Sequence, residues 1–298
     1  MRTPLQNRDS PSGGTWLAAL LLSTLRLIPV VVMSVAAWPL ANLWLRVLMS
    51  GRSRRLMQTN IEKVWNLPGH SWFARALATQ ALYHQIITAI ESIGFLLRRS
   101  LWNSGIVDDS DLAAVARDLP SGPVIIISGH VGAWELGAFF GAKWLGRRFN
   151  VLAKPAKFHF VNAALETLRG AGGARVLWTG RQSILKDMIG VLRSGEALGF
   201  VMDQKPDNRR GVSLPFLGHP TEFVNGPAAM AMRFQCPIIS IFCVRTGPMR
   251  YRIVSRRIHL PKDAHEAAVT VLMAGELERV VRLYPEQWTW NYRRWRWE

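Results

Sequence analysis

The chain has 298 residues, of which 49% are hydrophobic and 19% are charged, and this composition excludes a disordered protein. Lys and Arg number 37 against 20 Asp and Glu, so the formal net charge is +17. A charge of that sign attracts anionic partners, such as nucleic acid, an acidic lipid surface or an acidic protein. The two cysteines, Cys236 and Cys243, stand in apolar surroundings and indicate reduced core residues rather than a disulfide scaffold.

The first segments of the chain predict a membrane-associated N-terminus. Residues 1–15 are polar and contain Pro and Gly, which predicts a disordered leader, and residues 16–55 predict an apolar membrane anchor. Residues 27–45 carry no charge over 19 positions, which as a helix is about 28 Å, close to the thickness of a hydrocarbon core. A spanning helix, a helix lying in the membrane surface and a segment of soluble core all remain open.

The rest of the chain predicts one α/β domain over residues 56–298. Helices are expected at 56–66 and 71–99, with Ser71 as N-cap, and a further helix should end before Pro120. Glu91 lies on the second of these helices, where we expect only a minor structural role. Short apolar runs then alternate with helical segments, a pattern that predicts a mixed, mostly parallel sheet flanked by helices. The expected strands are 123–128, 149–153, 174–177, 197–202, 237–244 and 250–256, and the expected helices 133–145, 158–169, 181–193 (capped by Thr179 or Gly180), 226–235 and 263–283.

A lone histidine follows the most apolar of these strands. The run from Val124 to Ile127 predicts a buried strand, and His130 stands where the chain turns into the next helix. Open α/β sheets bind ligands at this end of a strand. Glu135, on the first turns of that helix, is able to reach back to the imidazole, and a His–carboxylate pair suits removal of a proton from a hydroxyl that attacks a carbonyl. The alternative is a histidine bonded to a backbone carbonyl, with Glu135 on a solvated face.

Several blocks in one order along nearly the whole chain carry a resemblance to a known family. They are Gly129–Glu135, Ala153–Pro155, Met202–Gln204, Leu214–Gly218 with Gly226–Ala228, and Pro285–Trp288 through Arg293–Trp295. The first looks like the H-x4-D/E signature of bacterial lipid A late acyltransferases, the lauroyl and myristoyl transferases. The chain is similar also to phosphatidylinositol mannoside acyltransferases. The resemblance implies a glycerolipid-acyltransferase-like domain over residues 56–298.

Within this resemblance, His130 and Glu135 are the expected catalytic residues, with His130 as general base and Glu135 as its orienting carboxylate. Lys154 stands where the family usually has Arg, and it lacks the bidentate fork of a guanidinium. Lys154 is a candidate to hold a phosphate or the oxyanion as a point charge, and the alternative is a solvated lysine at the end of a strand. Backbone N–H groups of the glycine-rich turn are the other candidates to hold the oxyanion.

Further substrate-binding residues are expected downstream. Asp203 and Gln204 are expected to bind polar groups of the acceptor or to order the loop, and Arg209 and Arg210 to meet acceptor phosphates; a loop cap and solvated arginines are the alternatives.

The resemblance implies an O-acyltransferase that moves a fatty acyl chain from acyl carrier protein, or acyl-CoA, to a hydroxyl of a glycolipid such as a lipid A precursor. No covalent enzyme intermediate, cofactor or metal is expected, since the sequence has no G-x-S-x-G elbow, H-E-x-x-H motif or phosphate loop. Arginines after the apolar segment predict that the following domain is cytoplasmic. The resemblance implies that the membrane is a bacterial inner membrane.

Two other functions stay open from the residues. One is a glycerolipid or lysophospholipid acyltransferase, although its usual Pro-Glu-Gly-Thr block is missing. The other is a non-catalytic basic protein that binds membranes or nucleic acid. The tail Trp288–Trp297 interleaves cations with aromatics, which suits stacked bases, anionic headgroups or a folded core. The apolar segment favours a membrane over nucleic acid.

Overall fold

The computed structural model describes residues 49–206, 211–295 and 297, together with some of the positions between 20 and 47. The expected leader at 1–15 and much of the expected anchor lie outside these residues. Within the part of the chain that is described, no helix is both long and apolar enough to cross a membrane. The expectation of a spanning helix therefore has no support from the structure.

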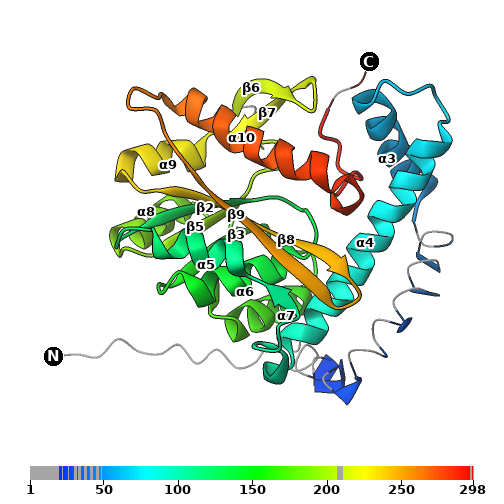
Figure 1. The fold of residues 1–298 in the computed structure, drawn as a ribbon, viewed down its shortest axis with the longest axis horizontal. Coiled ribbons are helices and arrows are strands. Elements are labelled where there is room, and N and C mark those ends of the chain that lie inside the picture. The colour runs from blue at the N-terminus through cyan, green and yellow to red at the C-terminus, as the bar shows by residue number, and fades with distance from the viewer. Residues whose placement is uncertain are drawn as a thin grey trace.

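Two N-terminal helices lie beside the sheet domain. Helix α3 covers Gly51–Val64 and begins earlier than predicted, because the Ser50 hydroxyl accepts a hydrogen bond from the Ser53 N–H (3.2 Å) and caps it. Helix α4 covers Trp72–Leu96, and Ser71 caps it as predicted. Figure 1 shows α4 running along the side of the sheet. Leu77 and Leu82 in its first half join one apolar core of the domain, and Phe95 and Leu96 at its end join the other.

A seven-stranded sheet forms the centre of the domain, with the order β1-β9-β8-β2-β5-β3-β4. Neighbouring strands pair in parallel except β8 with β9, which confirms the predicted mixed, mostly parallel sheet. Its strands are β1 Val107–Asp108, β2 Val124–Ser128, β3 Phe149–Ala153, β4 Ala174–Trp178, β5 Ala197–Val201, β8 Ile238–Gly247 and β9 Arg250–Ile258. A separate hairpin that was not predicted, β6 Gly211–Phe216 and β7 His219–Val224, follows β5.

Helices cover both faces of the sheet (Figure 1). On one face, buried residues of α5 (Ser110–Arg117), α6 (Trp134–Trp144) and α7 (His159–Ala171) join one apolar core. On the other face, those of α8 (Ile184–Arg193), α9 (Gly226–Phe234) and α10 (Glu266–Leu283) join a second core. Alternate residues of β2 enter the two cores, as expected of a strand buried on both faces. The predicted cap of α8 was wrong: Ser183 stands at its N-cap, after a turn that includes Thr179 and Gly180.

The strand order creates a switch point between β2 and β5. After β2 the chain crosses to α6 on one face, whereas after β5 it leaves toward the hairpin and α9 on the other. Because the two connections diverge, a crevice opens beyond the carboxyl ends of these neighbouring strands, where α/β proteins bind ligands. Ser128 is in register with Val201, so the residues that follow the two strands emerge side by side.

The C-terminal tail folds into the domain. Trp288, Trp290 and Trp295 are each at most 2% exposed. Trp288 packs on the other two, and both Trp288 and Trp295 pack on Phe216 of the hairpin. Of the three readings that the sequence left open for the tail, the folded core applies to these tryptophans. Cys236 and Cys243 are free and buried, as predicted.

Candidate active site

His130 lies in the crevice beyond β2, and its imidazole pairs with Asp203. The imidazole Nδ1 lies 2.8 Å from Oδ1 of Asp203, and the His130 backbone N–H donates to Oδ2 of the same carboxylate at 2.8 Å. The register of β2 and β5 explains the pairing, because His130 and Asp203 each stand two residues beyond the matched pair Ser128 and Val201. The imidazole is 26% exposed at its side chain and the carboxylate 3%, so the carboxylate lies behind the ring.

The pairing changes the proton affinity of both groups. Burial alone would raise the pKa of Asp203, but the charge of His130 and the hydrogen bonds from the imidazole, the Trp288 indole and the His130 backbone hold it down, at about 2. Burial would also lower the pKa of His130, but the charge of Asp203 and its hydrogen bond outweigh burial and raise the pKa above 6.5. In the neutral ring, Nδ1 keeps the proton that it donates to Asp203, so Nε2 carries the free lone pair.

Glu135 has a different partner from the one expected. Its two carboxylate oxygens accept hydrogen bonds from Nε and Nη2 of Arg169 on α7, at 2.7 and 2.6 Å. The Trp134 indole donates to the same carboxylate at 3.2 Å. The carboxylate that bonds the imidazole therefore comes from the segment after β5, and Glu135 acts on the imidazole only as a nearby charge that raises its pKa. The reason is the strand order, which brings Asp203 closer to the ring than the helix brings Glu135.

A cavity of about 690 Å³ opens in front of the imidazole. Three of the side chains that line it with His130 are cationic, Lys154, Arg169 and Lys205, and Gln204 and Tyr292 add polar atoms. Of the substrate-binding residues expected from the sequence, Lys154 and Gln204 line this cavity, while Asp203 lies behind His130. Arg209 and Arg210 lie outside the described residues.

A smaller apolar pocket of about 190 Å³ adjoins this cavity. Its walls include Ile93 and Leu96 of α4 and Leu168 of α7, and it shares Trp134 and Leu165 with the larger cavity. A polar, cationic space and an apolar space thus meet close to His130.

Comparison with known families gives the class of protein to which the chain belongs. The family described as bacterial lipid A biosynthesis acyltransferase matches residues 6–297, which is nearly the whole chain. The chain belongs to this family. It is therefore an acyltransferase, as the resemblance implied. No curated protein matches the chain in a direct comparison.

In this acyltransferase, the backbone N–H groups of the turn that carries His130 donate hydrogen bonds to other groups of the protein. The N–H groups of His130, Val131, Gly132 and Ala133 donate to Asp203 Oδ2, Gly129 O, Gln287 O and Cys243 O, at 2.7–2.9 Å. Gly132 has φ +60°, and a Cβ there would lie 2.1 Å from the carbonyl oxygen of Cys243. The turn is therefore fixed between β8 and the C-terminal tail, and only glycine fits at its centre.

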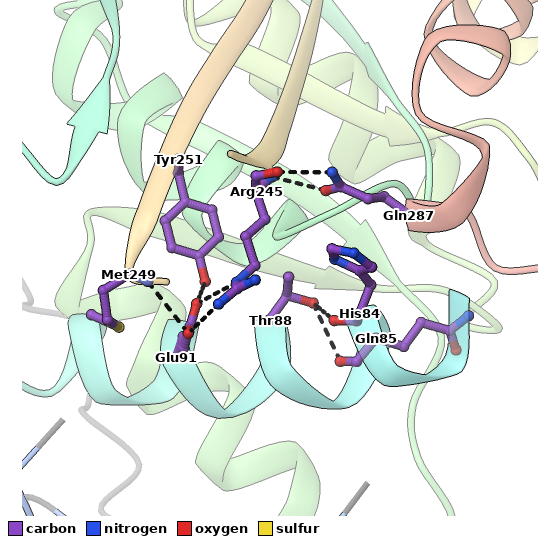
Figure 2. A network of polar contacts seen from close by, with 8 residues as sticks. All are labelled: His84, Gln85, Thr88, Glu91, Arg245, Met249, Tyr251 and Gln287. Carbon is purple, nitrogen blue, oxygen red and sulfur yellow. Dashed lines mark hydrogen bonds and ion pairs between the residues drawn. The ribbon is translucent and has the colours of Figure 1, made fainter. Parts of the chain in front are cut away.

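Behind the turn lies the buried polar network of Figure 2. Glu91 of α4 is fully buried and accepts hydrogen bonds from Nε and Nη2 of Arg245 (both 2.9 Å) and from the Tyr251 hydroxyl. Gln287 in turn bonds the backbone N–H and carbonyl of Arg245. Glu91 has a larger structural role than expected, because its carboxylate joins α4, β8 and β9.

Sequence reasoning missed two residues that bond the carboxylates around His130: Arg169 bonds Glu135, and Trp288 bonds Asp203. Arg169 lies in the last turn of α7 with no motif to single it out, and it is 34 residues from Glu135 in the sequence, so only the packing of α6 against α7 brings the two side chains together. Trp288 donates its indole N–H to Asp203 at 2.9 Å, and its membership in the C-terminal block was the one signal in the sequence. Among the described residues, no cluster of three or more His, Cys, Asp or Glu side chains is arranged to hold a metal ion.

Proposed function

We propose that this enzyme moves a fatty acyl chain from a thioester donor, acyl carrier protein or acyl-CoA, to a hydroxyl of a glycolipid such as a lipid A precursor. The observation that carries the proposal is the His130–Asp203 pair at the wall of the cavity, with Nε2 as the nitrogen left to meet a substrate. A base with a pKa near neutrality in this position suits activation of a hydroxyl.

The reaction follows from this placement. His130 Nε2 takes the proton of the acceptor hydroxyl as its oxygen bonds to the carbonyl carbon of the thioester. The tetrahedral oxyanion then collapses, the C–S bond breaks, and the thiolate recovers the proton from the imidazolium. Asp203 stabilises the imidazolium between these steps, and the transfer is direct, with no acyl-enzyme.

In this proposal, a cationic side chain stabilises the tetrahedral oxyanion. The sequence left two donors open, backbone N–H groups of the glycine-rich turn or Lys154. Since the N–H groups of residues 130–133 already donate to other oxygens, we favour Lys154, which lines the same cavity as His130.

The shape of the site supports a lipid substrate. The cationic side chains Lys154, Arg169 and Lys205 suit phosphate groups on a glycolipid acceptor, and the adjoining apolar pocket suits hydrocarbon of the acyl chain. The net charge of +17 suits docking of an acidic carrier protein and of an anionic membrane. We place the enzyme at the cytoplasmic face of a bacterial inner membrane, held by residues 16–55.

The test is lipid mass spectrometry. Membranes, or a purified lipid A precursor in mixed micelles, are supplied with acyl-loaded carrier protein and with wild type, His130→Ala or His159→Ala at matched protein levels. His159 is exposed at the start of α7 and serves as the control. We expect a lipid heavier by one acyl group with wild type and His159→Ala and none with His130→Ala. A product that persists with His130→Ala would rule out this mechanism.

A further inference from the structure

A three-residue segment of the tail, Gln287 to Thr289, runs against the turn that carries His130. Val131 and Trp288 form an antiparallel bridge, and the Gly132 N–H donates to the carbonyl of Gln287 at 2.9 Å. The backbone N–H and hydroxyl of Thr289 both donate to the carbonyl of His130, at 3.2 and 3.0 Å. The backbone on both sides of the imidazole is therefore held by the tail.

Trp288 extends this contact to the carboxylate. Its indole N–H donates to Oδ2 of Asp203 at 2.9 Å, the oxygen that also accepts the His130 backbone N–H. Oδ1 is left for the imidazole Nδ1. Because Trp288 is 2% exposed and packed among aromatic rings, its donor direction is fixed, and with it the plane of the carboxylate.

The segment is itself anchored to the sheet. The side-chain amide of Gln287 accepts a hydrogen bond from the Arg245 backbone N–H at Oε1 (2.8 Å) and donates one from Nε2 to the Arg245 carbonyl (2.9 Å), so this side chain occupies the place of a neighbouring strand's backbone. The Arg245 guanidinium is in turn held by the buried Glu91 (Figure 2). A continuous series of hydrogen bonds and neighbouring residues therefore links Glu91 on α4, Arg245 on β8 and Gln287 and Trp288 of the tail to Asp203.

We propose that Trp288 is a positioning residue of the active site, which orients Asp203 so that the imidazole keeps the tautomer with a bare Nε2. The inference rests on the proposed function of His130 as general base. Acting through Asp203, Trp288 contributes to the rate of proton transfer without contacting the substrate.

Other charges face this pair, and none of them replaces the indole. Arg294 of the tail acts on Asp203, and Glu135 and Arg169 act on His130. These side chains alter the charge balance, whereas the indole N–H is a neutral donor that fixes a direction. Removing it leaves the formal charges of the site unchanged.

The experiment compares Trp288→Phe with Trp295→Phe. Both tryptophans are 2% exposed and contact Phe216, but the Trp295 indole N–H has no hydrogen-bond partner among the described residues. The two variants thus leave similar cavities, and only one loses a hydrogen bond to the site. We expect kcat of Trp288→Phe to fall about ten- to a hundredfold, as for a lost hydrogen bond to a charged group, with KM little changed. Trp295→Phe should stay within about threefold of wild type.

A second measurement does not depend on the reaction. Nitrogen NMR of histidine-labelled enzyme reports the tautomer of His130, whose signals are identified by their loss in His130→Ala. We expect the Nδ1–H tautomer in wild type and Trp295→Phe and a mixture of tautomers in Trp288→Phe. Equal kcat values or one tautomer in all three proteins would overturn the proposal. If wild type transfers no acyl group, the proposed function fails, while the tautomer still decides whether Trp288 orients the pair.

Discussion

At the scale of single residues, His130 is influenced by two carboxylates in different ways. Asp203 bonds the ring directly, whereas Glu135 is bonded to Arg169 and contributes only its charge. Sequence spacing identified His130 because a histidine after a buried strand stands out. It could not identify the hydrogen-bonded carboxylate, because that depends on β5 lying beside β2, although the two are distant in the chain.

The Glu135–Arg169 pair predicts a coupling between these two residues. The side chains are 22% and 12% exposed, so their interaction should lie between that of surface pairs, about 0–1 kcal/mol, and that of buried pairs, about 3–5 kcal/mol. We expect Glu135→Gln and Arg169→Gln each to lower the free energy of unfolding. The loss in the double variant should be about 1–3 kcal/mol smaller than the sum of the two single losses. Chemical denaturation of the four proteins gives this coupling. Additive effects would show that the pair is not formed in solution.

At the scale of elements, the turn after β2 depends on one glycine. Gly132 and Gly146 both have φ +60°, but a Cβ at Gly146 meets nothing within 4 Å, whereas at Gly132 it would meet the Cys243 carbonyl. Gly146→Ala should therefore cost only the backbone strain, about 1 kcal/mol, and keep its activity. Gly132→Ala should cost several kcal/mol more, or displace His130 and lower kcat by at least about a hundredfold. Thermal unfolding and transfer assays on both variants check this, and similar behaviour of the two would contradict it.

The buried network of α4, β8 and β9 predicts a second contrast. Glu91 is fully buried against Arg245, which is 10% exposed, while the pair of Asp111 and Arg252 is 35% and 48% exposed. Glu91→Gln should lower the free energy of unfolding by about 3–5 kcal/mol because it leaves a buried guanidinium without its charge partner. Asp111→Asn should cost at most about 1 kcal/mol. Equal losses in urea denaturation would show that Glu91 is not essential to the core.

Elements were predicted well where local signals decide them. The strand at 149–153 matches β3, and the predicted helices at 133–145 and 226–235 match α6 and α9 to within one residue at each end. The hairpin β6–β7 was missed for a local reason. Its two-residue turn places Leu217 at φ +51° before Gly218, where Asn or Asp is usual, and Pro215 and Pro220 stand opposite each other in its strands. Neither feature is a usual sequence signal for a β-hairpin.

At the scale of the whole molecule, the proposed membrane location rests on the net charge and on the apolar N-terminal residues. The order of the sequence blocks indicated the family, which the family comparison confirms, while the placement of the C-terminal block against the turn that carries His130 required the tertiary structure. In this proposal, the net charge of +17 attracts the protein to anionic lipid and the apolar residues 16–55 retain it there.

This combination predicts how binding to vesicles depends on salt. Raising the ionic strength from about 0.1 M to about 1 M shortens the Debye length from about 10 Å to about 3 Å and should weaken the electrostatic part of binding. We expect the full chain to stay largely bound to anionic vesicles in sedimentation assays at the higher salt, and a variant lacking residues 1–48 to be released. Complete release of the full chain would contradict the apolar anchor.

The most direct test of the central claim is the pH dependence of kcat/KM for wild type, Asp203→Asn and Glu135→Gln. His130 acts as a base only when unprotonated, and Asp203 raises its pKa above 6.5, so activity of the wild type should fall with decreasing pH along a limb centred above 6.5. Without the Asp203 charge the imidazole pKa falls, so the limb of Asp203→Asn should move to lower pH while the plateau rate drops by roughly a hundredfold or more. Glu135→Gln should move the limb less. A larger displacement with Glu135→Gln than with Asp203→Asn, or a limb that neither substitution moves, would contradict the assignment of His130 and Asp203 as the catalytic pair.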